Sequence, residues 1–375
     1  MAKFKEKIYV TNPLLPSIEE MMKELSDIWD SKWITNMGSK HKLLEKKLKK
    51  ELKVPHVSLF NNGTIALLTA LKALDLPSGS EVITTPFTFA ATPHVISWND
   101  LKPVFCDIEP DTMTIDADKI EAAITSRTSA ILAVHVYGYP CNIKKIQSIA
   151  KKHDLKIIYD GAHVFSTEIK GKGIGNFGDI TMFSFHATKL FNTAEGGCLT
   201  YRDGRLVDKI YNLRNFGICN EDEVVDVGIN GKMSEIQAAL GLLNLKLYRK
   251  EMEKRKRIQQ RYRKILSRVQ GIRIPVVSGN TTDSFQYFPI VIGNEYFQSR
   301  DDLYCAMKKN NVMARKYFYP LCSDFKPYKQ MRSSRRDNLP VANDLKNRVL
   351  CLPFYGSLTL DQVDGICMII AGKVR

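Results

Sequence analysis

The sequence predicts an α/β protein built on a mostly parallel β-sheet. One observation is that short apolar stretches alternate with longer stretches of helical character through the first two thirds of the chain. A second is that residues 157–159 and 180–185 are largely apolar, as buried strands are. A third is the length, because 375 residues are enough for two domains.

Composition removes several classes of protein. Hydrophobic residues make up 44% and charged residues 25%, which is typical of a globular protein. The first residues, MAKFKEKIYVTNPLLP, lack the apolar segment of a secretory signal, and no apolar run approaches membrane-spanning length. The eight cysteines are scattered, without metal-ligand spacing. We therefore expect a cytoplasmic protein with reduced thiols, no metal site and no membrane partner.

The formal net charge of +15 raises the possibility of a nucleic-acid partner. The lysines, however, are spread along the chain and often accompany glutamates, as in HKLLEKKLKKELK. That pattern is typical of a solvated helix face. A basic surface also suits a small substrate that carries a diphosphate, so no nucleic-acid partner is expected.

The N-terminal region reads as two helices, 17–29 and 40–52, joined by the linker SKWITNMGS. Residues 56–76 then give a strand, a glycine turn and an apolar helix that opens at Asn62-Gly63-Thr64. A helix start offers free N–H groups and a positive dipole end, which favour a phosphate group. Gly63 permits close approach and Thr64 can donate a hydrogen bond, although Asn-Gly is equally an ordinary helix cap.

Further strands and helices alternate from residue 82 to Asp160. Strands are expected at 82–84, in KPVFCDI and in SAILAVHVYGYP, with helices at 116–124 and 143–153. The next strand ends at Asp160, and open α/β sheets bind ligands at the carboxyl ends of their strands. Asp160 is therefore a candidate site residue, with a helix N-cap as the alternative.

The segment 178–197, GDITMFSFHATKLFNTAEGG, is the most informative stretch of the sequence. It places Lys189 just after a buried strand and before a tight glycine turn. A lysine shielded from water loses its proton more easily, and the neutral amine can attack a carbonyl. Taken alone, Lys189 could equally be a surface lysine. Together with Asp160 it suits a pyridine cofactor, whose aldehyde binds the lysine and whose ring nitrogen is kept protonated by the carboxylate.

The C-terminal part has a different pattern. Residues 243–269 form a long, highly charged helical stretch, and short strands and helices follow from about residue 270. We expect a large domain at 1–245, which includes the N-terminal helices, and a linking helix with a small domain at 246–375.

Two motifs resemble those of a known family. SFHATK, with EGG six residues after the lysine, and YDGAH resemble the lysine and aspartate signatures of the DegT/DnrJ/EryC1/StrS sugar aminotransferases, and the likeness continues in order through nearly the whole chain. The resemblance implies the aspartate aminotransferase-like fold, PLP fold type I. That fold has a mostly parallel seven-stranded sheet, typically with one antiparallel strand, and a small C-terminal α+β domain.

The resemblance also implies an activity. It is the pyridoxal 5'-phosphate (PLP)-dependent transfer of an amino group from L-glutamate to a nucleotide-linked keto-deoxysugar in a homodimer with shared active sites. SKWITNMG and RKYFYPL are similar to the branch that makes dTDP-4-amino-4,6-dideoxyglucose, so dTDP-4-keto-6-deoxyglucose is the expected acceptor. A 3-keto-sugar or UDP-sugar aminotransferase of the family is the alternative. A sugar dehydratase is disfavoured because histidine replaces the lysine there, and a regulator because it need not keep Lys189.

Roles for individual residues follow from the same resemblance. Lys189 holds PLP and moves the proton, and Asp160 sustains the electron-accepting ring. The other expected cofactor contacts are the phosphate ligands Gly63, Thr64 and Ser184, the stacking ring of Phe89, His163 near the phenolic oxygen, and Asn230 reaching the phosphate of the partner subunit. A core role for Phe89 and a structural one for His163 are the alternatives. Lys232 stands where the family has an arginine, which leaves its role open.

Overall fold

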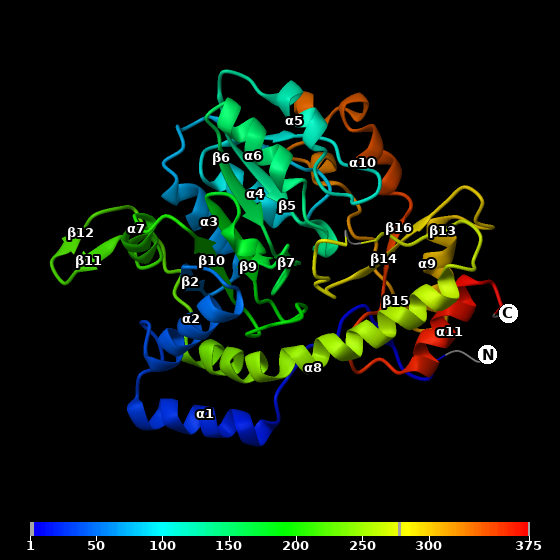
Figure 1. The fold of residues 1–375 in the computed structure, drawn as a ribbon, viewed down its shortest axis with the longest axis horizontal. Helices are drawn as coiled ribbons and strands as arrows, with labels where there is room; N and C mark the ends of the chain where they lie inside the picture. Colours follow the sequence, from blue (N-terminus) through cyan, green and yellow to red (C-terminus); the bar gives the residue numbers. More distant parts are fainter. Residues whose placement is uncertain (1–3, 277–278, 374–375) are drawn as a thin grey trace.

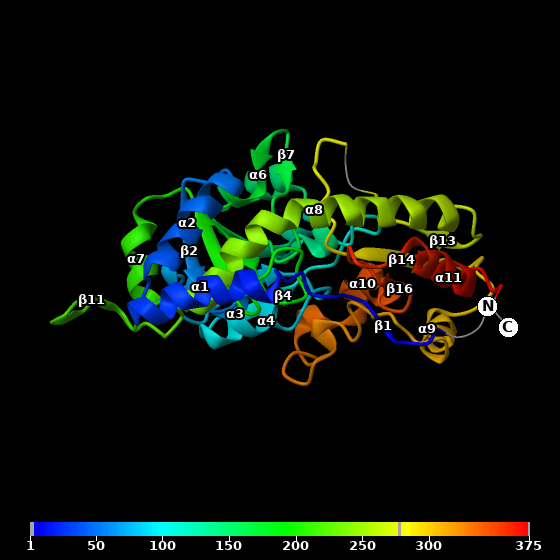
Figure 2. The same ribbon diagram turned by 90° about the horizontal axis from the view of Figure 1, so that it is seen from below.

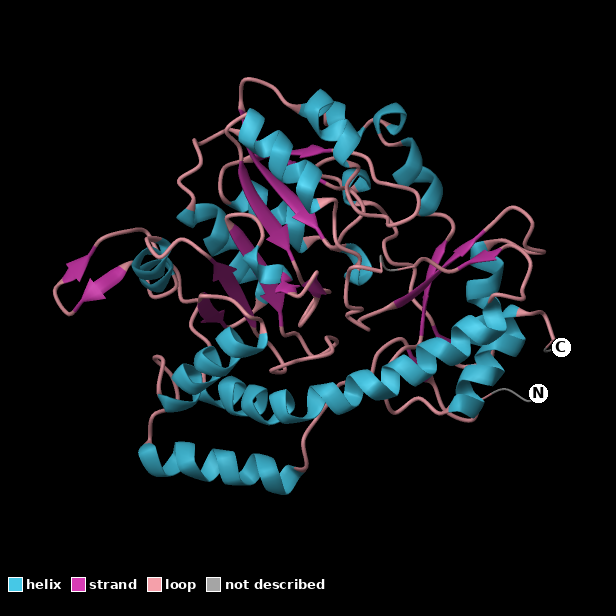
Figure 3. Ribbon diagram, viewed as in Figure 1, coloured by secondary structure: helices cyan, strands magenta, loops and turns pink. Residues whose placement is uncertain are grey.

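A seven-stranded sheet organises the computed structural model, which describes residues 4–276 and 279–373 (Figures 1 and 3). The strands follow one another across the sheet in the order β2 (His56–Phe60), β10 (Gly197–Tyr201), β9 (Ile180–Ser184), β6 (Lys156–Asp160), β5 (Thr128–Val134), β3 (Glu81–Thr84) and β4 (Lys102–Phe105). β10 is antiparallel to both neighbours, and the other pairs are parallel. The predicted α/β class and the mostly parallel sheet are confirmed.

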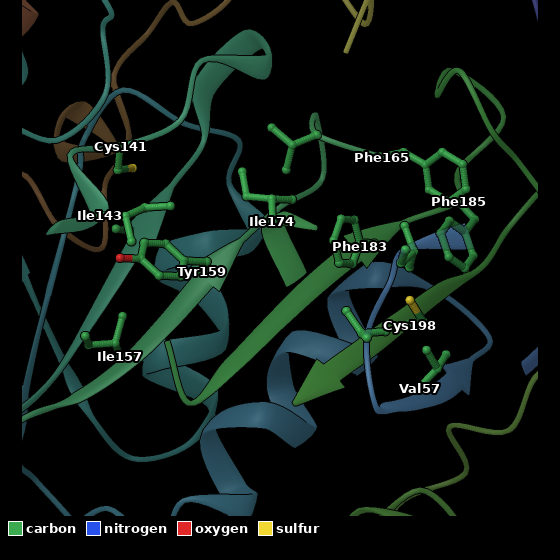
Figure 4. Packing of buried hydrophobic residues seen from close by; sticks show 14 of the residues in the cluster. Val57, Cys141, Ile143, Ile157, Tyr159, Phe165, Ile174, Phe183, Phe185 and Cys198 are labelled. Atoms are coloured by element: carbon green, nitrogen blue, oxygen red, sulfur yellow. The ribbon is translucent and has the colours of Figure 1, made fainter. Parts of the chain in front are cut away.

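Helices cover both faces of this sheet because its side chains alternate between two apolar cores. On β6, Ile157 and Tyr159 face one core and Ile158 the other. Figure 4 shows Ile157, Tyr159 and Phe183 in the first of these cores. The helices of the first core are α2 (Ser39–Glu51), α5 (Ala117–Ala123), α6 (Ile143–Lys152) and the start of α8 (Glu235–Leu266), and those of the second are α3 (Gly63–Ala73), α4 (Ala91–Trp98) and α7 (Leu206–Leu213).

Local capping fixes where several helices begin. Ser17 caps α1 (Ile18–Ser31) in a reciprocal pair with Glu20. The helix therefore begins at Ile18, one residue after the expected start at 17. Asn142 caps α6 through the N–H of Lys145. The expected helices at 17–29, 40–52, 116–124 and 143–153 all form, with ends shifted by one or two residues.

Helix α8 is one continuous helix of 32 residues that begins at Glu235, before the helical stretch expected at 243–269. It begins at a capping box made by Ser234 and Gln237 and is about 48 Å long at 1.5 Å per residue. At Gly241 of α8, a Cβ would lie 2.7 Å from Leu44 Cδ2 of α2. The glycine thus allows α2 to pack closely. Figure 1 shows α8 running from the large sheet toward the C-terminal elements.

The C-terminal elements form their own apolar core around a three-stranded antiparallel sheet. Its members are β13 (Ile272–Arg273), β14 (Phe288–Ile292), β16 (Val349–Leu352), α9 (Arg300–Lys309), β15 (Val312–Met313) and α11 (Leu360–Ile370). The N-terminal strand β1 (Ile8–Tyr9) pairs with β15, and Ile8 is buried in this core. Figure 2 shows β1 beside the C-terminal elements. The first residues therefore lie with the C-terminal core, although they fall within the expected 1–245 domain. The boundary at 245/246 stays a prediction.

A buried ion pair in the middle of α8 binds the helix to the C-terminal part. Arg255 Nε donates to Glu251 Oε1 at 2.8 Å, and both side chains are almost fully buried. Glu251 Oε1 also accepts from the N–H of Gly356 at 2.7 Å, and Arg255 Nη1 donates to the carbonyl of Phe285 at 3.2 Å. The segments before β14 and after β16 are therefore both anchored to α8.

Smaller elements complete the described chain. They are the hairpins β7 (Glu168–Ile169)–β8 (Lys172–Gly173) and β11 (Ile218–Asn220)–β12 (Glu223–Val224), the short helix α10 (Pro340–Leu345) and the 3-10 turns η1 (Val136–Gly138), η2 (Ile174–Asn176), η3 (Cys322–Asp324), η4 (Arg332–Ser334) and η5 (Arg336–Asn338). Hairpin β11–β12 projects from the body of the molecule (Figure 1). Every helix within the described ranges is too short or too polar to cross a bilayer.

Candidate active site

The candidate residues from two sequence segments meet at the carboxyl edge of the large sheet. β6 and β9 are parallel neighbours, with Asp160 opposite Met182, so Asp160 and Ser184 both end strands at this edge. Lys189 lies in the turn that follows β9, and His163 lies three residues after Asp160. The parallel register therefore brings the aspartate and lysine segments together.

Asp160 is a buried carboxylate with a hydrogen bond to each oxygen. Its side chain is 5% exposed, Oδ1 accepts from the N–H of Ala162 at 3.1 Å, and Oδ2 accepts from the Thr92 hydroxyl at 2.9 Å. Burial raises the pKa of Asp160, while these donors and the nearby Lys189 oppose the rise. The next element after Asp160 is strand β7, so the residue is not a helix N-cap.

Lys189 is a half-buried lysine held beside an aromatic ring. Its Nζ lies 5.7 Å from the centre of the Tyr287 ring. Burial lowers the pKa of Lys189 to about 8, and the negative charge of Asp160 works against this shift. A much larger fraction of neutral amine is therefore present near neutral pH than for an exposed lysine.

The backbone around Lys189 is fixed by Gln286. This buried side chain accepts from the N–H of Leu190 at 2.8 Å and donates to the carbonyl of Thr188 at 3.1 Å. Both functions of one amide are therefore used on the two residues that flank Lys189. The turn is also closed by the Phe185 carbonyl, which accepts from the N–H of Thr193.

His163 is a buried histidine in a defined protonation state. Its Nδ1 accepts from the N–H of Tyr137 at 3.0 Å, and its ring is stacked on Phe318 and edge-on to Tyr287. Burial, Lys189 and His135 lower the pKa of His163 well below its usual value. The ring is therefore neutral, and since Nδ1 is an acceptor, its proton resides on Nε2.

The start of α3 offers the expected cradle for an anion. Asn62 caps the helix by accepting from the N–H of Ile65 at 2.8 Å, which leaves the first helical N–H groups available. A Cβ on Gly63 would lie 3.1 Å from Ser184 Cβ, and one on Gly197 would lie 2.8 Å from Gly63 Cα. Gly63 and Ser184 are thus in contact, and the Thr64 side chain beside them is exposed.

Two phenylalanines that precede α4 differ sharply in exposure. Phe87 is completely buried against Tyr137 and Phe318. Phe89 is 63% exposed, so its ring remains available to stack on a bound molecule. A role for Phe89 in the protein core, the alternative considered above, is therefore wrong.

Asn230 is exposed, and its backbone is attached to its own subunit's α3 region. Its carbonyl accepts from Asn61 Nδ2 at 3.3 Å, and its residue pairs as a β-bridge with Asn215. The backbone of Asn230 therefore lies beside Asn61, the residue that precedes the Asn62 cap of the same chain. The prediction that it reaches a partner's phosphate stays a prediction.

Two basic residues near Asn230 have contacts that explain them structurally. Arg214 is buried and donates to Glu45 at 2.9 Å and to the Leu59 carbonyl at 2.8 Å. Lys232 donates to Asn215 Oδ1 at 2.8 Å. Arg214 holds the segment between α7 and α8 against β2 at the sheet edge, and Lys232 joins two residues within that segment.

Several residues of this site carried no signal in the sequence. They are Thr92, Tyr137, Gln286, Tyr287 and Phe318. Gln286 and Tyr287 lie almost a hundred residues beyond Lys189, in a stretch that the sequence marks only as a strand. Their placement depends on the packing of the C-terminal part against the large sheet.

The donor set fits PLP. A buried carboxylate stands at one strand end, a lysine of lowered pKa follows the next strand, and a glycine-lined helix start lies in contact with the same strand. A bound PLP would supply an aldehyde to Lys189, a ring nitrogen to Asp160 and a phosphate group to the α3 cradle.

Comparisons with known proteins agree with this chemistry. A model of the DegT/DnrJ/EryC1/StrS aminotransferase family matches residues 17–371. The chain is 46% identical over 370 residues to dTDP-4-amino-4,6-dideoxy-D-glucose transaminase of Escherichia coli, covering 98% of this chain and 99% of that one. It is 30% identical over 349 residues to GDP-perosamine synthase of Vibrio cholerae, covering 92% and 94%.

Solved structures are similar over the same extent. A crystal structure of DesI in the presence of its TDP-sugar product superposes with a TM-score of 0.93 at 32% identity, covering 100% of this chain and 95% of that one. The PLP form of the putative sugar aminotransferase Spr1654 from Streptococcus pneumoniae gives a TM-score of 0.89 at 26% identity, covering 98% and 100%. With its family match and this site, the chain belongs to the DegT/DnrJ/EryC1/StrS family of PLP-dependent aminotransferases.

Proposed function

We propose that this protein transfers an amino group from L-glutamate to C4 of dTDP-4-keto-6-deoxyglucose and so makes dTDP-4-amino-4,6-dideoxyglucose. The observation that carries the proposal is the 46% identity over nearly the full length to the E. coli transaminase that is named for this product. The Lys189–Asp160 arrangement supports the same class of reaction from its geometry.

The proposed cofactor contacts come from four elements of the chain. PLP supplies an aldehyde and an electron-accepting ring when it is bound. Its phosphate would bind the first N–H groups of α3 at Gly63 and Thr64 and the Ser184 hydroxyl. Phe89 would stack on the ring, and His163 would donate from Nε2 to the phenolic oxygen.

Lys189 and Asp160 divide the catalytic work in this proposal. Lys189 Nζ is the group that binds the aldehyde and, once released, carries the proton during each half-reaction. Its lowered pKa suits both tasks, because the amine can be neutral or charged near neutral pH. Asp160 keeps a proton on the ring nitrogen, and Tyr287 and Phe318 exclude water from the site.

The second candidate is an aminotransferase for another nucleotide-linked keto-sugar. The 30% identity to GDP-perosamine synthase favours it, as does 30% identity over 356 residues to a UDP-linked altrosamine transaminase of Helicobacter pylori. Both identities are lower than that to the dTDP-sugar enzyme, so this candidate ranks second.

We also propose a homodimer as the active form. Large apolar side chains are exposed on α1 and its linker and near hairpin β11–β12, and such surfaces usually mark interfaces. They include Ile18, Met22, Trp29, Trp33, Ile34, Phe216, Val224, Val225 and Val227. The proposed compartment is the cytoplasm, because all eight cysteines are free thiols.

The substrate assignment is tested with a panel of dTDP-, UDP- and GDP-linked 3-keto- and 4-keto-sugars. With L-glutamate as donor, dTDP-4-keto-6-deoxyglucose should give the highest kcat/KM, and NMR of the product should show an amino group at C4. A higher kcat/KM for a UDP- or GDP-linked sugar would transfer the assignment to the second candidate.

Lys189→Ala should abolish turnover but retain binding of pyridoxamine phosphate, because the proposed phosphate and ring contacts do not involve Nζ. In the unmodified protein freed of cofactor, the rate of combination with PLP should rise as the pH approaches about 8, since burial lowers the pKa of Lys189 to about 8 and the neutral amine is the reactive form. Lys250→Ala, on the exposed face of α8, is the control. Turnover in Lys189→Ala would contradict the central role of this residue.

Asp160→Asn should bind PLP yet lose on the order of a hundredfold or more in kcat, because the neutral amide no longer favours a proton on the ring nitrogen. Stopped-flow measurement of the glutamate half-reaction isolates this effect from sugar binding. The exposed Asp154→Asn should behave like the parent. A rate in Asp160→Asn close to that of the parent would remove Asp160 from the mechanism.

Subunit mixing tests whether Asn230 serves the partner's site. Asn230→Asp places a negative charge near the phosphate, so this variant should be inactive alone, as should Lys189→Ala. In hybrid dimers a contribution across the interface restores one native site, so randomly mixed subunits should recover about a quarter of the parental activity. No recovery would mean that Asn230 acts in its own subunit, and a fully active monomer in sedimentation would refute the dimer.

A further inference from the structure

Two buried threonines stand behind the Asp160 carboxylate on the segment that opens α4. Thr92 is 0% exposed and its hydroxyl donates to Asp160 Oδ2 at 2.9 Å. Thr88 is 4% exposed, and its hydroxyl oxygen lies 3.0 Å from that of Thr92. The three groups form a continuous chain of hydrogen bonds that is closed off from water.

The direction of this chain follows from the carboxylate. An ionised carboxylate can only accept, so the Thr92 proton must point at Asp160. The Thr92 oxygen is then free to accept, and the Thr88 hydroxyl is the donor to it. Successive donors polarise one another, so Thr88 strengthens the bond that Thr92 makes.

This use of a helical threonine differs from the ordinary one in the same protein. Thr69, buried in α3, donates to the carbonyl of Ile65 at 2.9 Å, four residues earlier in its own helix. The Thr92 hydroxyl instead leaves its own helix for a residue 68 positions away. A buried threonine that only filled space could make the bond that Thr69 makes.

The position of the threonines is fixed from the C-terminal part of the chain. Cys322 donates through its N–H to the Pro86 carbonyl at 2.9 Å and through Sγ to the Thr88 carbonyl at 3.2 Å. Ser97, near the end of α4, lies 3.1 Å from the Tyr328 hydroxyl. The donor to Asp160 is therefore held at both ends of its segment.

We propose that Thr92, supported by Thr88, is a positioning residue that keeps the Asp160 carboxylate ionised and turned toward the cofactor ring. The inference rests on the role proposed above for Asp160. A proton shared between the ring nitrogen and the carboxylate resides on whichever group has the higher proton affinity. A donor to Oδ2 lowers the proton affinity of the carboxylate, so the proton stays on the ring nitrogen, where the reaction needs it.

The hydrogen bonds from Thr88 through Thr92 to Asp160 offset the free-energy cost of burying an ionised carboxylate. Burial favours the neutral form of Asp160, and the groups that oppose it are the Ala162 N–H, the Thr92 hydroxyl and Lys189. Lys189 changes its bonding and charge during the proposed reaction, and the Ala162 N–H satisfies only Oδ1. Thr92 is the constant donor to the other oxygen.

The test compares Thr92→Val, which keeps the shape and removes the hydroxyl, with Thr92→Ser, which keeps the hydroxyl. Thr92→Val should bind PLP and show a kcat for the glutamate half-reaction lower by about tenfold, with little change in KM. The pH at which the visible absorption band of the bound cofactor titrates should move upward. That band reports the proton on the nitrogen that joins Lys189 to the cofactor, and a less positive ring repels this proton less. Thr92→Ser should restore both values.

Two further variants make the outcome decisive. Thr88→Val should move the titration in the same direction by a smaller amount, and it remains informative if Thr92→Val folds poorly. Thr69→Val, the matched control, should change neither the titration nor kcat. An unchanged titration in Thr92→Val and Thr88→Val, or equal losses in Thr92→Val and Thr92→Ser, would overturn the proposal.

These measurements use only PLP and L-glutamate, so they do not depend on which keto-sugar is the acceptor. A wrong sugar would therefore leave this result intact. Failure of the Asp160 role itself would instead appear as an unimpaired Asp160→Asn variant.

Discussion

Placing a buried carboxylate beside a half-buried lysine at one edge of a sheet is the constraint on which the rest of this structure depends. A buried charge is costly unless donors or an opposite charge accompany it. The parallel pairing of β6 and β9 brings the two segments together, and Gly161 permits the close approach of the chain after β6 to β9, since a Cβ there would lie 2.8 Å from the Met182 carbonyl oxygen. The Thr92 hydroxyl of α4 and the N–H of Ala162 then supply the compensating donors.

The site is built from residues of both the large sheet and the C-terminal part of the chain. Asp160 and Ser184 come from the large sheet, whereas Gln286 and Tyr287 come from the segment that leads into β14 of the C-terminal sheet. Gln286 fixes the backbone on either side of Lys189, and Tyr287 lies beside its amine. The surroundings that set the reactivity of Lys189 therefore depend on the packing of the C-terminal part against the large sheet.

Local chemistry made part of this structure predictable. Asp160, Lys189 and Gly63 stand where strands end or helices begin, and alternating apolar stretches indicate the sheet. Packing between distant segments decided the rest. Thr92 gives no signal until α4 lies against β6, and Tyr287 gives none until the C-terminal core is placed. The close packing of α2 against Gly241 of α8 is likewise not revealed by any local pattern.

The pairing of β1 with β15 means that the chain passes between the two cores twice, once through residues 10–17 and once through α8. The two parts also contact each other where the N–H of Cys322 donates to the Pro86 carbonyl, and where the N–H groups of Val341 and Ala342 donate to Asp107. Arg255 binds the Phe285 carbonyl to α8, one residue before Gln286. Gln286, which holds the backbone on both sides of Lys189, is therefore kept in place by the same helix that joins the two parts of the molecule.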